Sequence, residues 1–225
     1  MAFDLGDTLV DYEGLPLNWA AHYPAALSAL AAALDLKPTA SEIGAACTTL
    51  ASYNTRLHPR EREIPFTDIL REILPQLGGP ADAAPLRCAR AFFGVFRARL
   101  RCFSDTRPAL AALRQRGYKI GVFTDVPYGM PRELVEEDVS CAGLESLLDV
   151  LLTSTDIGRR KPSPLTLQCL AEALPCTPAA MIYVGNEQKD ITAARAFGCT
   201  AILLDRHDAS PDWGQDRTIS LLSEL

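Results

Sequence analysis

The sequence predicts a doubly wound α/β protein with an inserted helical segment. After residue 104, short apolar runs alternate with segments of helical periodicity, which is typical of a parallel sheet with helices on both faces. Between residues 15 and 101 the periodicity is helical throughout. The chain has 225 residues, 48% of them hydrophobic, so we expect one domain with a large insertion, or two small domains.

The first strand is expected at the N-terminus, where Met1-Ala2-Phe3 runs into a polar turn that begins at Asp4. This strand should be central and buried on both faces. Only three residues precede Asp4, whereas a strand usually has about 5–6 residues. We therefore expect either a truncated first strand or a native start upstream of Met1.

Four helices are expected in the insertion, each with apolar residues at helical spacing and with prolines near its ends. The markers are Leu27, Leu30 and Leu34 for the first, a cap at Ser41 for the second, Thr67-Asp68 for the third, and Phe92, Phe93, Phe96 and Leu100 for the fourth. We assign residues 14–101 to a helical cap, and residues 1–13 and 102–225 to the α/β core.

The core pattern continues with strands and helices in turn. Strands are expected at 118–124, 149–153, 181–184 and 201–204. Helices should begin near Ser104-Asp105, Pro131, Pro164 and Asp190, and Gly117 should end the first of them.

Composition excludes some partners and compartments. The formal charge is 22 − 28 = −6 and no basic block occurs, which argues against nucleic acid as a partner. No leader-like or membrane-spanning apolar run appears. The seven cysteines are odd in number and lack metal-ligand spacing, so we expect buried, reduced thiols and a cytoplasmic protein.

Reactive or charged residues follow four of the expected strands, and ligands of open α/β sheets bind at the carboxyl ends of strands. Each residue alone has an ordinary structural explanation, such as a turn residue, a solvated lysine or a helix cap. Four strand ends of this kind in order favour a single site. The residues are Asp4, then Thr124 and Asp125, then Lys161, then Asn186 and Asp190.

Together these segments resemble the four motifs of the haloacid dehalogenase superfamily. The matching segments are Asp4-Leu5-Gly6-Asp7-Thr8, Thr124, Lys161-Pro162, and Gly185-Asn186 with Asp190. The resemblance covers residues 1–10 and about 104–205, and the insertion lies where helical-cap members carry theirs. It implies a Rossmann-like core, with the cap closing over the substrate and selecting it.

The resemblance also implies the chemistry of the site. Asp4 would be the nucleophile, Thr124 would donate to a phosphate oxygen, and Lys161 would hold nucleophile and phosphate by charge. Mg²⁺ would be bound by Asp4, the main-chain carbonyl of Gly6 and Asn186, with Asp190 as a ligand directly or through water.

Three positions depart from the family pattern. Gly6 stands where most phosphatase members have a general acid, and extended geometry would point Asp7 the other way unless the turn brings it back as a substitute. Asn186 replaces an aspartate, which should weaken metal binding, and Glu187 either compensates or is a solvated acid. Asp125, where asparagine is common, either binds a substrate hydroxyl or caps a turn.

The favoured function is a magnesium-dependent phosphatase for a small phosphorylated metabolite. The alternatives are a metal-independent 2-haloacid dehalogenase and a degenerate binding or regulatory relative. The cap residues considered for substrate selection are Trp19, His22, Tyr23, Tyr53 and Arg56. Oligomeric state stays open.

Overall fold

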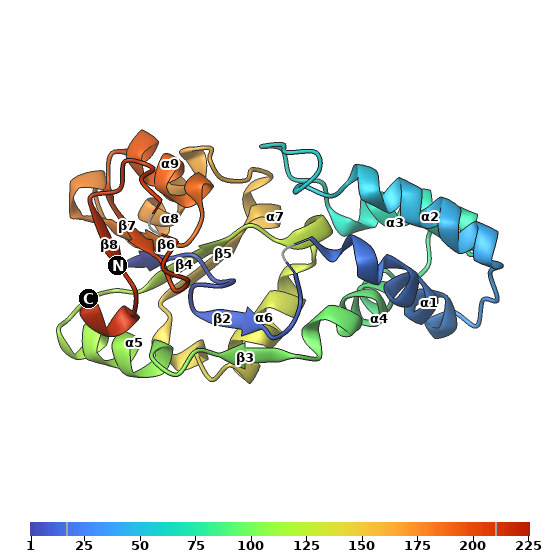
Figure 1. Ribbon diagram of the computed structural model, residues 1–225, viewed down its shortest axis with the longest axis horizontal. Helices are drawn as coiled ribbons and strands as arrows, with labels where there is room; N and C mark the ends of the chain where they lie inside the picture. Colours follow the sequence, from blue (N-terminus) through green and yellow to red (C-terminus); the bar gives the residue numbers. More distant parts are fainter. Residues whose placement is uncertain (17, 210) are drawn as a thin grey trace.

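The computed structural model describes residues 1–16, 18–209 and 211–225. Within them, a parallel sheet has the strand order β5-β4-β1-β6-β7-β8, as the fold class predicted (Figure 1). Its strands are β1 (Ala2–Phe3), β4 (Gly121–Thr124), β5 (Val150–Thr153), β6 (Ile182–Gly185), β7 (Thr200–Leu204) and β8 (Arg217–Ile219).

Helices cover both faces of this sheet. In Figure 1, α5 (Thr106–Gln115) and α6 (Arg132–Cys141) lie below it, whereas α7 (Ser154–Ile157), α8 (Leu165–Ala173) and α9 (Gln188–Phe197) lie above it. Successive residues of a strand pack into two different apolar clusters, one on each face of the sheet. Phe3 packs in one with α5 and α6, and Ala2 packs in the other with α8 and α9.

Strand β1 is central, as expected, because it pairs with β4 on one side and β6 on the other. It is only two residues long, and both residues are fully buried. The carboxyl end of this short strand carries Asp4 into the middle of the sheet edge.

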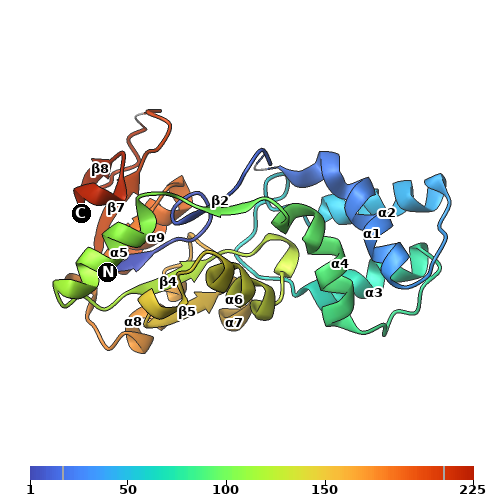
Figure 2. The same cartoon turned by 90° about the horizontal axis from the view of Figure 1, so that it is seen from below.

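The helices between residues 19 and 97 form a group beside the sheet, on the right of Figure 1. The group contains a 3₁₀ turn η1 (Trp19–His22) and the helices α1 (Tyr23–Ala33), α2 (Ala40–Ser52), α3 (Phe66–Gln76) and α4 (Pro85–Arg97). The chain enters through β2 (Val10–Tyr12) and returns through β3 (Leu100–Cys102), which pair antiparallel, so both connections run side by side (Figure 1). The view in Figure 2 shows the helical group to the same side of the sheet.

Several local expectations need correction. Thr39 rather than Ser41 caps α2, because its hydroxyl accepts the Glu42 N–H while Glu42 reaches back to the Thr39 N–H. Helix α3 begins at Phe66, one residue before Thr67. Leu100 lies in β3 instead of α4. The pairing of β2 with β3, the short helix α7 and the edge strand β8 were not expected.

The cysteines are all free, but only Cys88 and Cys199 are buried, and Cys141 is exposed. The expectation of uniformly buried thiols is therefore wrong, because the others lie on partly exposed faces of helices, in β3 or in a loop. Among the helices that the structure describes, none combines the length and apolar character needed to cross a bilayer.

Candidate active site

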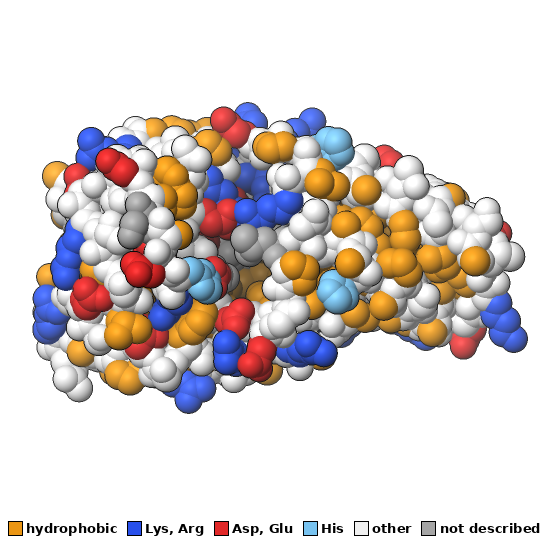
Figure 3. Space-filling model, viewed as in Figure 1, with side chains coloured by type: hydrophobic (Ala, Val, Ile, Leu, Met, Phe, Trp, Pro, Cys, Tyr) orange, Lys and Arg blue, Asp and Glu red, His pale blue; other side chains and the backbone are white. Residues whose placement is uncertain are grey.

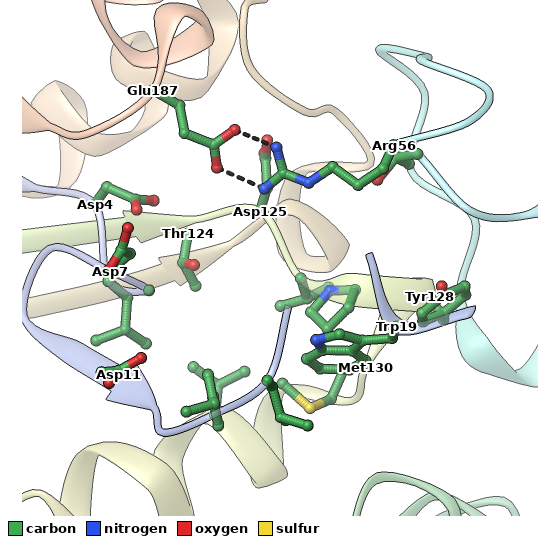
Figure 4. A pocket seen from close by; sticks show the side chains of 18 of the residues that line it. Asp4, Asp7, Asp11, Trp19, Arg56, Thr124, Asp125, Tyr128, Met130 and Glu187 are labelled. Carbon is green, nitrogen blue, oxygen red and sulfur yellow. Dashed lines mark hydrogen bonds and ion pairs between the residues drawn. The ribbon is translucent and has the colours of Figure 1, made fainter. Parts of the chain in front are cut away.

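Three neighbouring strands end at one cavity. Asp4 follows β1, Thr124 ends β4, and Asn186 follows β6. Asp4 and Thr124 line a cavity of about 540 Å³ at this edge of the sheet. The surface is hollowed between the sheet and the helical group (Figure 3), and Figure 4 shows both side chains beside the cavity. The strand ends thus converge as the topology requires.

Asp4 and Lys161 form a buried ion pair behind the cavity. Lys161 Nζ lies 2.5 Å from Asp4 Oδ1 and 2.6 Å from Asp190 Oδ1. Burial by itself would lower the pKa of Lys161, but Asp190 and Asp4 hold it well above its usual value. Burial raises the pKa of Asp4 to about 7, against the pull of the Lys161 charge. Asp4 is therefore a poorly solvated carboxylate beside a fixed cation, which suits a nucleophile.

Asp190 holds the turn after β6. Its Oδ2 accepts the main-chain N–H groups of Asn186 (3.1 Å) and Glu187 (2.9 Å), and its Oδ1 faces Lys161. Gly185 permits this packing, because a Cβ there would lie 2.5 Å from the Asp190 carboxyl carbon. Both Asp190 oxygens thus have partners in the protein, and the residue positions its neighbours from behind.

The turn after β1 brings Asp7 back to the cavity. The N–H groups of Thr8, Leu9 and Val10 all point to the Leu5 carbonyl, and Asp7 itself adopts a left-handed φ of 59°. This conformation breaks the extended alternation that would have pointed Asp7 away, so Asp7 lines the cavity together with Asp4 (Figure 4).

Gly6 lines the same cavity, and an added Cβ would meet no atom within 4 Å. The carboxylate that the family pattern places here is replaced by open space.

Asn186 links the turns that follow β1 and β6. Its Nδ2 donates to Asp7 Oδ2 (3.1 Å), and its Oδ1 accepts from Thr8 Oγ1 (3.2 Å). Burial raises the pKa of Asp7, while His207 at 3.6 Å opposes the shift. Asp7 therefore holds a proton more readily than an exposed aspartate, which is the direction of pKa change that a general acid requires.

Asp125 lines the cavity but is bound to the Lys161 loop. Its Oδ1 accepts the Lys161 main-chain N–H at 3.0 Å, and Lys189 Nζ lies 3.3 Å from its Oδ2. Burial would raise the pKa of Asp125, yet the charges of Lys189, Lys161 and Arg160 keep it below the usual value. This geometry favours a positioning role over a bond to a substrate hydroxyl.

A second ion pair spans the cavity from the insertion to the core. Arg56, between α2 and α3, donates to both Glu187 oxygens at 2.5 and 2.7 Å (Figure 4). Burial disfavours the charged form of Glu187, but the hydrogen bonds from Arg56 and the charge of Lys189 bring its pKa to about 2. Glu187 is thus neither a free solvated acid nor a carboxylate open to a metal.

The five insertion residues considered for substrate selection differ in whether they line the cavity. Trp19 and Arg56 line the cavity. Tyr23 is buried behind it, where its hydroxyl pairs with that of Tyr128 at 2.6 Å. His22 and Tyr53 are not among the described lining residues.

Sequence reasoning missed Glu63. Its carboxylate accepts from Arg160 and from Ser154 Oγ (2.5 Å), and the Glu63 side chain is 1% exposed. Main-chain hydrogen bonds run from Glu63 N to the Gly158 carbonyl and from Arg160 N to the Glu61 carbonyl. Part of the insertion is therefore fastened to the loop that carries Lys161, and no motif in the sequence signals a contact about 97 residues apart.

The donors at this edge are oxygens, which suit Mg²⁺. Asp4, the Gly6 carbonyl and the Asn186 amide oxygen fit an ion that takes one or two carboxylates and completes its shell with water and substrate phosphate. Among the described residues there is no group of three His, Cys, Asp or Glu side chains placed to hold a metal. An ion bound beside Asp4 would therefore take its other ligands largely from amide, main-chain and solvent oxygens.

The doubly wound α/β fold and the buried Asp–Lys pair at its strand ends suit a hydrolase. The family comparison agrees: the haloacid dehalogenase-like hydrolase model matches residues 1–198, and the chain belongs to that family.

Among curated relatives, a phosphatase of Mycobacterium tuberculosis is 36% identical over 55% of this chain and 55% of its own length. A phosphoglycolate phosphatase of Neisseria meningitidis is 28% identical over 95% of this chain and 87% of its own. A phosphoserine phosphatase of Thermus thermophilus is 33% identical over 66% and 60%, respectively. The chain thus spans little more than half of two of these three relatives.

Solved structures share the fold. A phosphatase of the family from Thermococcus onnurineus has a TM-score of 0.67 at 23% identity, covering 100% of this chain and 94% of its own. A 2-haloacid dehalogenase from Pseudomonas syringae has a TM-score of 0.69 at 24% identity, with the same coverage. Phosphatases and dehalogenases alike match, so fold similarity does not separate the two activities.

Proposed function

We propose that this protein is a magnesium-dependent phosphatase that hydrolyses a small phosphate monoester through an aspartyl-phosphate on Asp4. The observation that carries the proposal is the buried Asp4 carboxylate, 2.5 Å from Lys161 and open to a cavity that Thr124 also lines. The relatives named above as phosphoglycolate and phosphoserine phosphatases support phosphomonoesters as the substrate class.

In this proposal, an Asp4 oxygen attacks phosphorus while the bond from phosphorus to the ester oxygen breaks. Thr124 donates to a phosphate oxygen, and the Lys161 charge offsets the negative charge that gathers around Asp4. Asp7 gives its proton to the departing ester oxygen. It then takes a proton from the water that attacks the acyl-phosphate, so phosphate leaves and Asp4 is restored.

Bound Mg²⁺ would be held by Asp4, the Gly6 carbonyl and Asn186, and would offset repulsion between a carboxylate and a phosphate dianion. Asp190 would be a ligand directly or through water, and the two main-chain N–H groups that its Oδ2 already accepts favour the contact through water. We propose the helices of residues 14–101 as the cap that covers the substrate, and a cytoplasmic location, which the seven free cysteines support.

Phosphate release from a panel of monoesters, with Mg²⁺ and with chelator, tests the proposal. Asp4→Asn should lower turnover by at least about a hundredfold without loss of folded structure, since losing a nucleophile costs orders of magnitude. Asp11→Asn is the matched control, because Asp11 also lines the cavity but pairs with Arg101. Retained turnover in Asp4→Asn would reject the nucleophile.

A second candidate function is a metal-independent 2-haloacid dehalogenase, which the absence of a carboxylate at Gly6 favours. The same experiment tests it. Halide release from 2-haloacids that persists in chelator, without phosphate release from any ester, would favour it. Absence of both activities, together with no beryllofluoride adduct on Asp4, would favour a non-catalytic binding protein.

A further inference from the structure

The end of the cavity away from the carboxylates is apolar. Trp19, Tyr128 and Met130 lie together there, opposite Asp4 and Asp7 (Figure 4). The Trp19 ring stacks on Phe96, with centroids 4.1 Å apart and planes at 10°, which holds it in place. The Tyr128 hydroxyl is turned to Tyr23 at 2.6 Å, so the ring of Tyr128 is what the residue can offer to a ligand.

The cationic side chains of the cavity are already matched with acids. In the part of the chain that the structure describes, each lysine or arginine that lines the cavity has a carboxylate within 3.4 Å. The pairs are Arg56 with Glu187, Lys189 with Asp125, Arg160 with Glu63, and Arg101 with Asp11. A second acidic group on the substrate would compete with these carboxylates for their cations.

We propose that the substrate is the phosphate ester of an alcohol with an aromatic or similarly broad apolar group, and without a carboxylate. The inference rests on the proposed function and narrows its substrate. The cavity volume of about 540 Å³ is far larger than a phosphate ester of a two-carbon acid would fill. The phosphate would lie at Asp4 and Thr124, and the ring would lie against Trp19, Tyr128 and Met130.

Binding of non-hydrolysable phosphonates tests this independently of turnover. Calorimetry in Mg²⁺ would compare 2-phenylethylphosphonate, ethylphosphonate and phosphonoacetate. The phenylethyl ligand should bind about tenfold or more tightly than the ethyl ligand, since its ring leaves water for an apolar wall. Phosphonoacetate should bind no better than ethylphosphonate. Equal affinity for all three, or preference for phosphonoacetate, would overturn the inference.

Variants locate the effect. Trp19→Ala should reduce the phenylethyl-to-ethyl ratio to within about threefold, because the stacking surface is lost. His22→Ala, on the same turn but outside the lining residues, should leave the ratio unchanged. If Trp19→Ala unfolds, Met130→Ala tests the same wall. An unchanged ratio in a folded wall variant would reject the placement.

Turnover separates the two proposals. 2-Phenylethyl phosphate and ethyl phosphate have leaving alcohols of similar basicity, so their kcat/KM ratio reports the ring rather than the chemistry. A wild-type ratio of about ten or more supports the inference, and a ratio near one contradicts it. If neither ester is hydrolysed while the phosphonates show the expected order, the proposed function fails and the ligand class stands.

Discussion

Asp4 combines a strand-end position with a buried ion pair, and its titration is the first test at the scale of single residues. In the metal-free protein, burial raises the pKa of Asp4 to about 7. The carboxylate form, which alone can attack phosphorus, should therefore grow as pH rises through about 7. Carboxyl-carbon NMR should show this midpoint, with Asp4→Asn assigning the signal.

Lys161→Met should move that midpoint upward, because the Lys161 charge pulls the Asp4 pKa down. Added Mg²⁺ should move it downward, since a cation favours the charged form. A midpoint near 4 in the metal-free protein would show that the pair is ionised throughout the neutral range.

The second residue-scale prediction concerns the proton for the leaving group. Because Asp7 lies at the cavity with a raised pKa, Asp7→Asn should slow ethyl phosphate by about 10²–10⁴-fold, the usual contribution of general acid catalysis. It should slow p-nitrophenyl phosphate far less, since that phenolate leaves without a proton.

The Gly6→Asp variant distinguishes two cases: Asp7 serves as the general acid, or the protein has no general acid. The new side chain has open space, so its effect should be chemical rather than steric. If Asp7 already serves, the added charge repels the phosphate dianion and every substrate slows. Faster ethyl phosphate hydrolysis in Gly6→Asp, with a nearly unaffected Asp7→Asn, would instead mean that the acid is missing.

At the scale of elements, the segment around Glu63 is a fixed part of the core edge. An isolated antiparallel β-bridge between Arg62 and Arg159 and the Glu63–Arg160 ion pair join the insertion to the Lys161 loop. Glu63→Gln leaves the buried Arg160 charge with only Asp125, at 3.9 Å, as an acidic partner, so the free energy of unfolding should fall by up to about 3–5 kcal/mol. Urea denaturation measures this change.

Asp68→Asn is the matched control, because Asp68 also pairs with an arginine but its side chain is 50% exposed. Its cost should stay below about 1 kcal/mol, as for surface ion pairs. Equal costs for the two variants would show that the Glu63 pair is not anchoring the loop.

At the scale of the whole molecule, the insertion meets the core on several sides. The paired strands β2 and β3 carry both connections, and Arg97 of α4 binds Asp138 of α6 at 2.7 Å. The Arg56–Glu187 pair adds a contact across the cavity, with side chains 35% and 23% exposed. A movement of the insertion away from the core at the cavity would break this contact.

Glu187→Gln should therefore loosen the segment around Arg56 without unfolding the core. Removing a partly exposed pair is worth at most about 1 kcal/mol, so amide hydrogen exchange at residues 54–60 should speed up by no more than about fivefold. Exchange in β4 and β6 should not change. Unchanged exchange at 54–60 would indicate that the pair does not restrain the insertion.

Much of this protein is determined by its sequence alone. Alternation of apolar strands and helices sets the layered sheet, and the short run before Asp4 is central because its residues are apolar on both faces. Asp4, Thr124, Lys161 and Asp190 can be placed together because parallel strands bring their carboxyl ends to one edge. These features follow from local periodicity and from one topological rule.

Other features depend on tertiary structure. The direction of the Asp7 side chain depends on the left-handed φ of this residue. The sequence does not predict that conformation, because a non-glycine residue rarely adopts it. The pairs Arg56–Glu187 and Glu63–Arg160 join residues about 100 or more positions apart. Charged side chains at such separations have many possible partners, and only the packed arrangement of insertion and core selects among them. The apolar wall of the cavity is decided in the same way, because Trp19 and Met130 meet only when the two parts are folded together.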